Sequence, residues 1–403
     1  MSDPTERKFV VRDVAGTFTI QTLAALALYS IPVFAPAAAL DYGVDATQVG
    51  VFSGIAYFTA MLVGLVTGAF VTRYGAMRTG QACMVFAALA MVAFAVGSPW
   101  LAVVSAIFLG LNYGPVNPLS AHILTKVTTA KTRPLIFSIK QTGVTVGGAL
   151  AGITVPFLVL TFGWRVGALI IGAAALTAML LVHPMRRRLD SDRRPTAPLR
   201  SASLMGPVRL IAKDPVTLHL AIMALIFSGI QLTAAAFLVI FLNDHLELPL
   251  VEAGALFALS QVGGTLGRIF WGAISGAYFK PRHVLTVLGL ITCASYAVLA
   301  LSEPDWPPMI LAILCFILGA SSYGWNGVYL SEVASLAPPG KIGEVTGGVQ
   351  FFMFAGAFMA PPCFSVIASF GGGFSMAFMV FAIIAGVTGL SLTWLSKYHR
   401  PEA

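Results

Sequence analysis

Twelve apolar stretches, most of them about twenty residues or longer, constrain what this chain can fold into. An α-helix of that length crosses the hydrocarbon core of a bilayer, which is about 30 Å thick. The stretches are too long for barrel strands and lack strict alternation, so they predict membrane-spanning helices. The predicted spans are 14–39, 48–72, 80–98, 101–125, 136–160, 165–183, 217–242, 251–278, 284–302, 308–336, 345–369 and 374–396.

The composition excludes a soluble protein. Hydrophobic residues make up 58% of the chain and charged residues 10%, and the mean hydropathy is +0.87. Soluble domains carry about 25% charged residues. The net charge of +8 lies mostly in short loops, where it indicates membrane orientation rather than nucleic-acid binding. The four cysteines have no spacing typical of a metal site or a disulfide framework.

One long polar segment, 184–216, interrupts the apolar pattern near the middle of the chain. It predicts a linker between two six-helix bundles, at 1–183 and 217–403. The fold class expected is therefore all-α, a polytopic membrane protein with twelve transmembrane helices in two pseudo-symmetric bundles. The basic residues of the linker are Arg186, Arg187, Arg188, Arg193, Arg194, Arg200, Arg209 and Lys213.

The distribution of Lys and Arg gives the expected orientation. With the N-terminus in the cytoplasm, nearly all basic loop residues fall on the cytoplasmic side, and Arg165 alone lies opposite. This is the positive-inside pattern, and it predicts an even number of spans with both termini cytoplasmic. We expect the cell inner membrane as the location, and the N-terminal segment does not resemble a cleaved signal peptide.

The two halves share weak internal similarity. A shift of 204 residues places Arg78 on Arg282, and a shift of 210 places Tyr113 on Tyr323. Such a parallel repeat is typical of transporters with a ligand site at the repeat interface.

The loop after the second predicted span, GAFVTRYGAMR, is similar to the G-x-L-x-D-R-x-G-R-R signature of the major facilitator superfamily. The matching positions are Gly68, Arg73, Gly75 and Arg78. Thr72 stands where the signature has Asp, which puts in doubt the latch that this Asp forms in the family. The resemblance covers nearly the whole chain. It implies a monomeric permease that works by alternating access, with this loop involved in gating.

Charged residues inside a bilayer are costly, so the few in this chain are the first candidates for function. Arg268 lies in the eighth predicted span and shares a helical face with Gln261 and Thr265. Its guanidinium is suited to clamping a carboxylate, and the alternative is that it satisfies helix carbonyls or a fixed acid. This span resembles the eighth helix of monocarboxylate and oxalate/formate-type porters, in which an intramembrane Arg is associated with the substrate carboxylate.

Lys140, in the fifth predicted span, is a second candidate. It shares a face with Gly143 and Gly147, a small-residue stripe that lets another helix approach closely. Lys140 either points inward and adds positive charge to the substrate route, or extends to the membrane interface.

Glu332, at the end of the tenth predicted span, lies on one face with Trp325 and Tyr329. Either it carries a proton, or it forms half of a cytoplasmic gate with Lys140 or His122. Polar and aromatic residues within the spans are further candidates for ligand contact or helix packing. They are Tyr29, Tyr57, Asn112, Tyr113, Asn117, Gln231, Tyr323, Trp325 and Asn326. The family resemblance implies a cavity lined by the first, fourth, seventh and tenth helices.

Basic rather than acidic residues within the spans favour secondary transport of a small organic anion, a carboxylate above all. Proton symport is the coupling considered. An exporter of amphipathic or cationic compounds is the alternative, and such a protein would be expected to carry acids in its cavity. We expect the partners to be the substrate and the lipid bilayer. No motif indicates an enzyme, a cofactor, a metal site or nucleic-acid binding.

Overall fold

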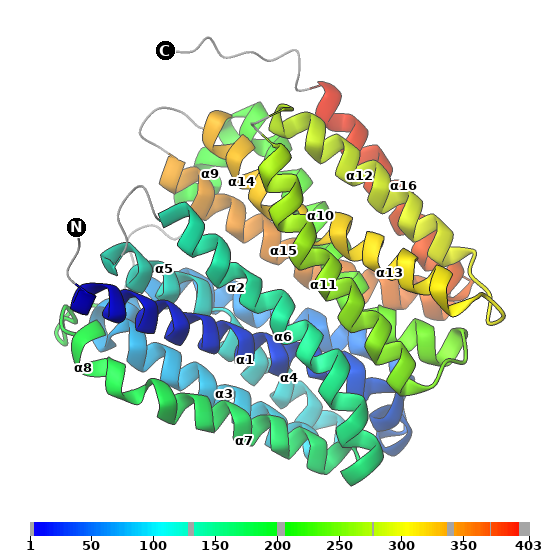
Figure 1. The fold of residues 1–403 in the computed structure, drawn as a ribbon, viewed down its shortest axis with the longest axis horizontal. Helices are drawn as coiled ribbons and strands as arrows, with labels where there is room; N and C mark the ends of the chain where they lie inside the picture. Colours follow the sequence, from blue (N-terminus) through cyan, green and yellow to red (C-terminus); the bar gives the residue numbers. More distant parts are fainter. Residues whose placement is uncertain are drawn as a thin grey trace. The chain divides into compact units, whose positions relative to one another are not determined.

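The computed structural model describes residues 4–127, 133–199, 206–275, 278–336, 342–370 and 372–394. Within these ranges the chain is helical, and its one extended pairing is an isolated bridge between Ser275 and Phe279 (Figure 1). Twelve helical segments of the described chain are long and apolar enough to cross a bilayer. This number confirms the span count expected from the sequence.

The chain divides into two compact units, which are described separately. Unit 1 contains Met1–Gly43 and Ile55–Leu204, and unit 2 contains Val44–Gly54 and Met205–Ala403. The helices of unit 1 are α1 (Pro4–Tyr42), most of α2 (Val49–Tyr74), α3 (Ala76–Ala95), α4 (Pro99–Tyr113), α5 (Val116–Val127), α6 (Arg133–Phe162), α7 (Trp164–Val182) and α8 (Arg186–Leu189). Those of unit 2 are α9 (Gly206–Lys213), α10 (Pro215–Ile240), α11 (Leu250–Ile274), α12 (Pro281–Ala300), α13 (Pro308–Ser322), α14 (Trp325–Leu336), α15 (Ile342–Phe370) and α16 (Gly373–Trp394).

The helix pairs of the two units correspond. In unit 1, α1 packs on α6, and α3 packs on both α7 and α4. In unit 2, α10 packs on α15, and α12 packs on both α16 and α13. The fourth and tenth spans are each interrupted by two residues at corresponding positions, Gly114 and Pro115 in unit 1 and Tyr323 and Gly324 in unit 2. This correspondence supports the internal repeat inferred from the sequence.

Small residues determine how closely α1 and α6 approach each other. A Cβ atom added at Gly147 would collide with the backbone of Thr22 and would lie 2.7 Å from the Cβ of Ala25. One added at Gly143 would lie 3.0 Å from the Thr22 hydroxyl. The small-residue stripe predicted from the sequence is therefore confirmed as the α1–α6 interface.

The first part of α2 belongs to unit 2, where it packs on α15 together with the short helix η1 (Ala46–Gln48). A Cβ atom at Gly50 would come 2.6 Å from the carbonyl oxygen of Pro361. The hydroxyl of Ser365 donates a hydrogen bond of 2.8 Å to the carbonyl oxygen of Thr47. Backbone contact at glycine and this hydrogen bond hold the segment in place.

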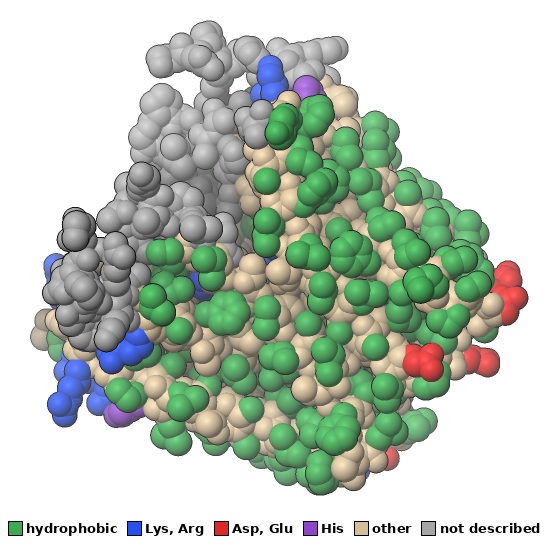
Figure 2. All heavy atoms as spheres, in the orientation of Figure 1, with side chains coloured by type: hydrophobic (Ala, Val, Ile, Leu, Met, Phe, Trp, Pro, Cys, Tyr) green, Lys and Arg blue, Asp and Glu red, His purple; other side chains and the backbone are tan. Residues whose placement is uncertain are grey.

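Large hydrophobic side chains remain exposed along the helices, as expected for surfaces that face lipid. Leu160, Leu181, Ile269 and Val387 are examples, each more than half exposed. Figure 2 shows hydrophobic side chains over the flanks of the helices and basic side chains gathered at the end where α8 lies in Figure 1.

Candidate functional site

Lys140 is a buried cation in the membrane-spanning part of unit 1. Its side chain is 2% exposed, so it does not extend to the interface, and that alternative is wrong for this structure. The ammonium group donates hydrogen bonds to Oδ1 of Asn117 at 2.6 Å and to Oε1 of Gln141 at 3.1 Å. Both partners are neutral amides, and no carboxylate of the described chain lies within ion-pair distance of Lys140. Its positive charge is therefore solvated but not neutralised.

Further polar atoms lie in the interior of unit 1 without a hydrogen-bond partner among the residues that the structure describes. They include Oε1 of Gln21, the hydroxyl of Thr22 and Oδ1 of Asn112. Gln21 and Thr22 face Gly143, one helical turn from Lys140 on α6. Buried polar atoms are normally paired, so these acceptors are the ones expected to hold water or a ligand. Tyr29 lies on the same helix as Gln21 and is 4% exposed.

Arg268 lies on α11 in unit 2 and is half-buried. Its Nε donates a hydrogen bond of 3.0 Å to the carbonyl oxygen of Tyr323, where the tenth span is interrupted. Nearby, Nε1 of Trp271 donates a hydrogen bond of 3.0 Å to the carbonyl oxygen of Ala320. Both donors satisfy carbonyls at the C-terminal end of α13, which have no partner within that helix. Arg268 thus has a structural role that was one of the two alternatives considered for it.

The polar face predicted around Arg268 is only partly buried. Gln261 is 2% exposed, and its Nε2 has no hydrogen-bond partner in the described chain. Thr265 is half-buried, and its hydroxyl donates to the carbonyl oxygen of Gln261 at 3.1 Å. The hydroxyl of Tyr323 is also buried, close to Ser260 and Gln261.

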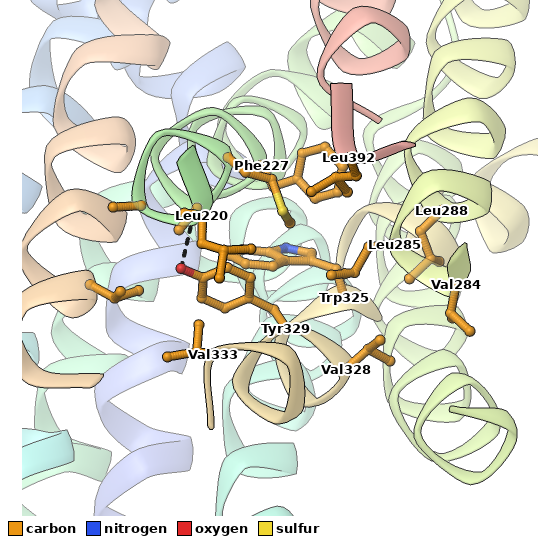
Figure 3. Packing of buried hydrophobic residues seen from close by; sticks show 14 of the residues in the cluster. Leu220, Phe227, Val284, Leu285, Leu288, Trp325, Val328, Tyr329, Val333 and Leu392 are labelled. Carbon is orange, nitrogen blue, oxygen red and sulfur yellow. Dashed lines mark hydrogen bonds between the residues drawn. The ribbon is translucent and has the colours of Figure 1, made fainter. Parts of the chain in front are cut away.

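Trp325 and Tyr329 are packing residues of unit 2. They are 1% and 0% exposed and lie within a hydrophobic cluster with Phe227, Leu285 and Val328 (Figure 3). The hydroxyl of Tyr329 donates a hydrogen bond of 2.9 Å to the carbonyl oxygen of Leu220, which is drawn dashed in Figure 3.

The polar edge of this cluster is made by α10 and α14. Oε1 of Gln231 accepts a hydrogen bond from Nε1 of Trp325 at 3.0 Å and another from Nδ2 of Asn326 at 3.2 Å. Asn326 is half-buried and Gln231 is 8% exposed. The indole N–H of buried Trp325 is therefore used by Gln231 within unit 2.

Glu332, on α14, pairs with a residue that was not among its expected partners. Its Oε1 lies 3.2 Å from Nε of Arg282 at the start of α12, and both side chains are buried. Burial raises the pKa of Glu332 above its usual range, and the positive charge of Arg282 opposes that effect. The gate partners expected from the sequence were Lys140 and His122. In the structure His122 lies 2.9 Å from Asp192 instead.

The signature loop of unit 1 is fixed by an acid from the linker. Asp190 accepts hydrogen bonds from the backbone N–H groups of Met77 at 2.7 Å and of Arg78 at 3.2 Å, at the start of α3. Gly75, just before α3, has φ 103°, which favours glycine. Gly75 is thus both a turn position and a position of close approach to Asp190. A Cβ atom added at Gly68 would meet nothing within 4 Å in this structure.

Other residues near Asp190 hold further helix ends of unit 1. These residues lie in the segment Arg188–Arg194 of the linker. Arg188 pairs with Asp13 on α1, Asp192 lies 2.5 Å from Lys126 on α5, and the N–H of Arg194 donates 2.7 Å to the carbonyl oxygen of Thr72 on α2. A little further on, Arg73 donates 3.5 Å to the carbonyl oxygen of Ala197. The first part of the predicted linker is therefore packed on unit 1.

Sequence reasoning missed several residues of these sites. Asp13 is 0% exposed and Asp190 is 5% exposed, although both lie in polar stretches that indicated surface loops. Gln21 gave no signal beyond being an amide in an apolar span. The acids could have been noticed because they stand next to the first and sixth spans, close to basic residues.

The helices and buried polar groups define a polytopic membrane protein of the transporter type. The chain belongs to the Major Facilitator Superfamily, whose family model matches residues 17–361. This is a family of transporters rather than enzymes, and the resemblance noted in the sequence is confirmed.

Curated relatives span nearly the whole chain. The chain is 22% identical to a hexuronate transporter of Bacillus subtilis, over 92% of this chain and 90% of that protein. It is 24% identical to a probable hexose phosphate transport protein of Chlamydia pneumoniae, over 87% and 84%. It is 25% identical to monocarboxylate transporter 11 of Mus musculus, over 91% and 83%. The names of these relatives describe anionic substrates.

Solved structures share the fold. A bacterial homologue of the human lysosomal transporter Spinster, in an inward-facing and occupied conformation, matches with a TM-score of 0.76 at 18% identity over 100% of both chains. The nucleoside transporter NupG matches with a TM-score of 0.76 at 14% identity, over 94% of this chain and 98% of that one. These likenesses support the fold alone.

Proposed function

We propose that this protein is a secondary active transporter that moves a small organic anion, a carboxylate above all, across the inner membrane by alternating access. The proposal includes proton coupling and a monomeric protein with both termini in the cytoplasm. The positive-inside distribution of Lys and Arg supports this orientation. Relatives that are named for hexuronate, hexose phosphate and monocarboxylate support the anionic class.

The observation that carries the proposal is the environment of Lys140. A buried ammonium group is costly unless it is paired or well hydrogen-bonded. Asn117 and Gln141 provide hydrogen bonds but no negative charge. An anion that enters supplies the missing counter-charge, whereas a cationic compound would be repelled. The surroundings of Lys140 therefore favour an anionic substrate over a cationic one.

The test is ligand binding to purified protein. The panel contains hexanoate, lactate, D-gluconate and D-galacturonate as carboxylates, glucose as a neutral sugar, and a cationic dye. We expect at least one carboxylate to bind, and neither glucose nor the dye. Lys140→Gln removes the charge at similar length and should weaken carboxylate binding about tenfold or more, since a hydrogen bond to a charged group contributes roughly 1.5–3 kcal/mol.

The matched control is Arg187→Gln, which removes a positive charge from an exposed linker position. Its carboxylate affinity should equal that of the wild type. Binding of the dye without any carboxylate would overturn the proposal in favour of an exporter of cationic or amphipathic compounds. Equal carboxylate affinity in the wild type and in folded Lys140→Gln would remove Lys140 from the site.

A further inference from the structure

The side-chain amide of Gln231 has a fixed orientation. The indole N–H of Trp325 can only donate a hydrogen bond, so the Gln231 atom that faces it at 3.0 Å must be the carbonyl oxygen. Asn326 donates to the same oxygen at 3.2 Å. Both donors come from α14, and Gln231 comes from α10. The NH2 group of Gln231 therefore points away from these two donors.

The remaining polar atoms of this amide pair are available to a ligand. Among the described residues, Nε2 of Gln231 and Oδ1 of Asn326 have no protein partner. Neither atom is sealed from solvent, in contrast to Nε2 of Gln261. Gln231 itself is more than nine-tenths buried, so its position is held by packing as well as by hydrogen bonds. The pair thus presents a donor from one side chain beside an acceptor from the other.

A donor beside an acceptor complements a hydroxyl group, which both donates and accepts. A carboxylate offers acceptors only, and a methylene group offers neither. We infer that Gln231 and Asn326 form a subsite for a hydroxyl group of the transported anion, so that the substrates are hydroxylated carboxylates such as hydroxy acids or sugar acids. Trp325 is a positioning residue that orients the Gln231 amide. This inference rests on the proposed function and adds selectivity to it.

The same hydrogen bonds could serve only to join α10 and α14. A purely structural pair would leave selectivity between ligands unchanged, because its loss would affect all ligands alike. Hydroxyl recognition predicts instead a loss that is confined to hydroxylated ligands. A site built to bind a hydroxyl discriminates strongly against an analogue that lacks it, because its buried polar groups are then left unpaired.

The experiment compares ligand pairs that differ only in hydroxylation, namely lactate with propionate, D-gluconate with hexanoate, and D-galacturonate with tetrahydropyran-2-carboxylate. Dissociation constants are measured on the full-length protein. For at least one pair, the wild type should bind the hydroxylated member about tenfold more tightly or better. Gln231→Leu and Asn326→Leu should bring this ratio close to one while leaving the affinity for the deoxy ligand unchanged. Trp325→Phe should lower the ratio by a smaller factor.

Tyr329→Phe is the matched control, because it removes a hydrogen bond from the same cluster without touching the amide pair. Its affinity ratio should equal that of the wild type. Two results would overturn the inference while leaving anion transport intact. One is a wild type that binds both members of every pair with equal affinity, and the other is a Gln231→Leu variant whose affinity falls by the same factor for both members. A wild type that binds no carboxylate of either kind would overturn the proposed function, and the subsite with it.

Discussion

The carboxylate of Asp190 lies directly against Gly75, with no room between them for a side chain. The same carboxylate accepts hydrogen bonds from the backbone N–H groups of Met77 and Arg78 and so caps the start of α3. The family signature places an Asp at the position of Thr72, which here has no carboxylate. An acid more than a hundred residues further along the chain thus stabilises the loop that the signature forms.

Replacing Gly75 by Ala should destabilise the protein by roughly 1–3 kcal/mol, because a non-glycine residue is strained at φ 103° and the new methyl group would displace Asp190. The measurement is thermal unfolding in detergent. Gly68→Ala is the control, since Gly68 lies seven residues earlier on α2 and its new methyl group meets nothing within 4 Å. Equal stability of Gly75→Ala and Gly68→Ala would contradict this account of the loop.

Asp190→Ala should remove the cap of α3 and cost about 1 kcal/mol, the usual effect of losing a side-chain acceptor at a helix N-terminus. Asp190→Asn retains a carbonyl oxygen as acceptor, so it should reduce the stability of the protein less than Asp190→Ala does. Chemical or thermal unfolding of the two variants checks the order. If the two variants proved equally unstable, the charge of Asp190 rather than its hydrogen bonds would be responsible.

Glu332 should make stability depend on pH. Burial raises its pKa above the usual 4.5, so the folded state binds a proton more tightly than the unfolded state. The stabilisation that follows is complete below about pH 4.5 and is lost as the pH rises through the raised pKa. Glu332→Gln cannot titrate. The stability of the wild type relative to this variant should therefore fall across that pH window, and a constant difference would show that the pKa is not raised.

Local patterns predicted the spans and the helix packing well. The spacing of Gly143 and Gly147 is a property of one helix, and the structure places α1 against that stripe. The partners of charged groups were not predictable in this way. Arg282 was assigned to a loop, yet it is buried beside Glu332, because the start of α12 packs on α14. Gly68 matches the family signature in sequence, but a Cβ atom added there would meet nothing within 4 Å.

The polar linker shows a second limit of sequence reasoning. Its charge and proline content indicated that it could not form an apolar core. Asp190 and Asp192 pack instead through hydrogen bonds and ion pairs to helix ends. Lys126 and His122 hold the pKa of Asp192 below its usual range, against the opposing effect of burial. A hydropathy pattern contains no information about such contacts.

The orientation of the chain is tested with reporters fused to loops. A reporter in the linker near Ser201 should lie in the cytoplasm, and one between Leu242 and Leu250 should lie on the opposite side. The reason is the excess of Lys and Arg in the loops assigned to the cytoplasm. Alkaline phosphatase and fluorescent protein fusions report the two sides. The same location for both fusions would contradict the twelve-span topology.

Arg268 is predicted to bind the negative charge of the substrate as well as to cap α13. Its Nε donates a hydrogen bond to the carbonyl oxygen of Tyr323. A guanidinium group has five N–H donors in a planar arrangement that suits a carboxylate. Arg268→Ala should lower carboxylate affinity about ten- to a hundredfold, because a charge-assisted hydrogen bond contributes roughly 1.5–3 kcal/mol. Arg268→Lys keeps the charge but not the fork, and its affinity should lie between those of Arg268→Ala and the wild type.

Trp271→Phe separates the two roles of Arg268. It removes the neighbouring hydrogen bond to the carbonyl oxygen of Ala320, at the same end of α13, without changing any charge. If Arg268 only caps the helix, Arg268→Ala and Trp271→Phe should both lower thermal stability and leave affinity unchanged. If it also binds the anion, only Arg268→Ala should weaken carboxylate binding. Stable Arg268→Ala protein with the affinity of the wild type would restrict Arg268 to capping and leave Lys140 as the cation that selects the substrate.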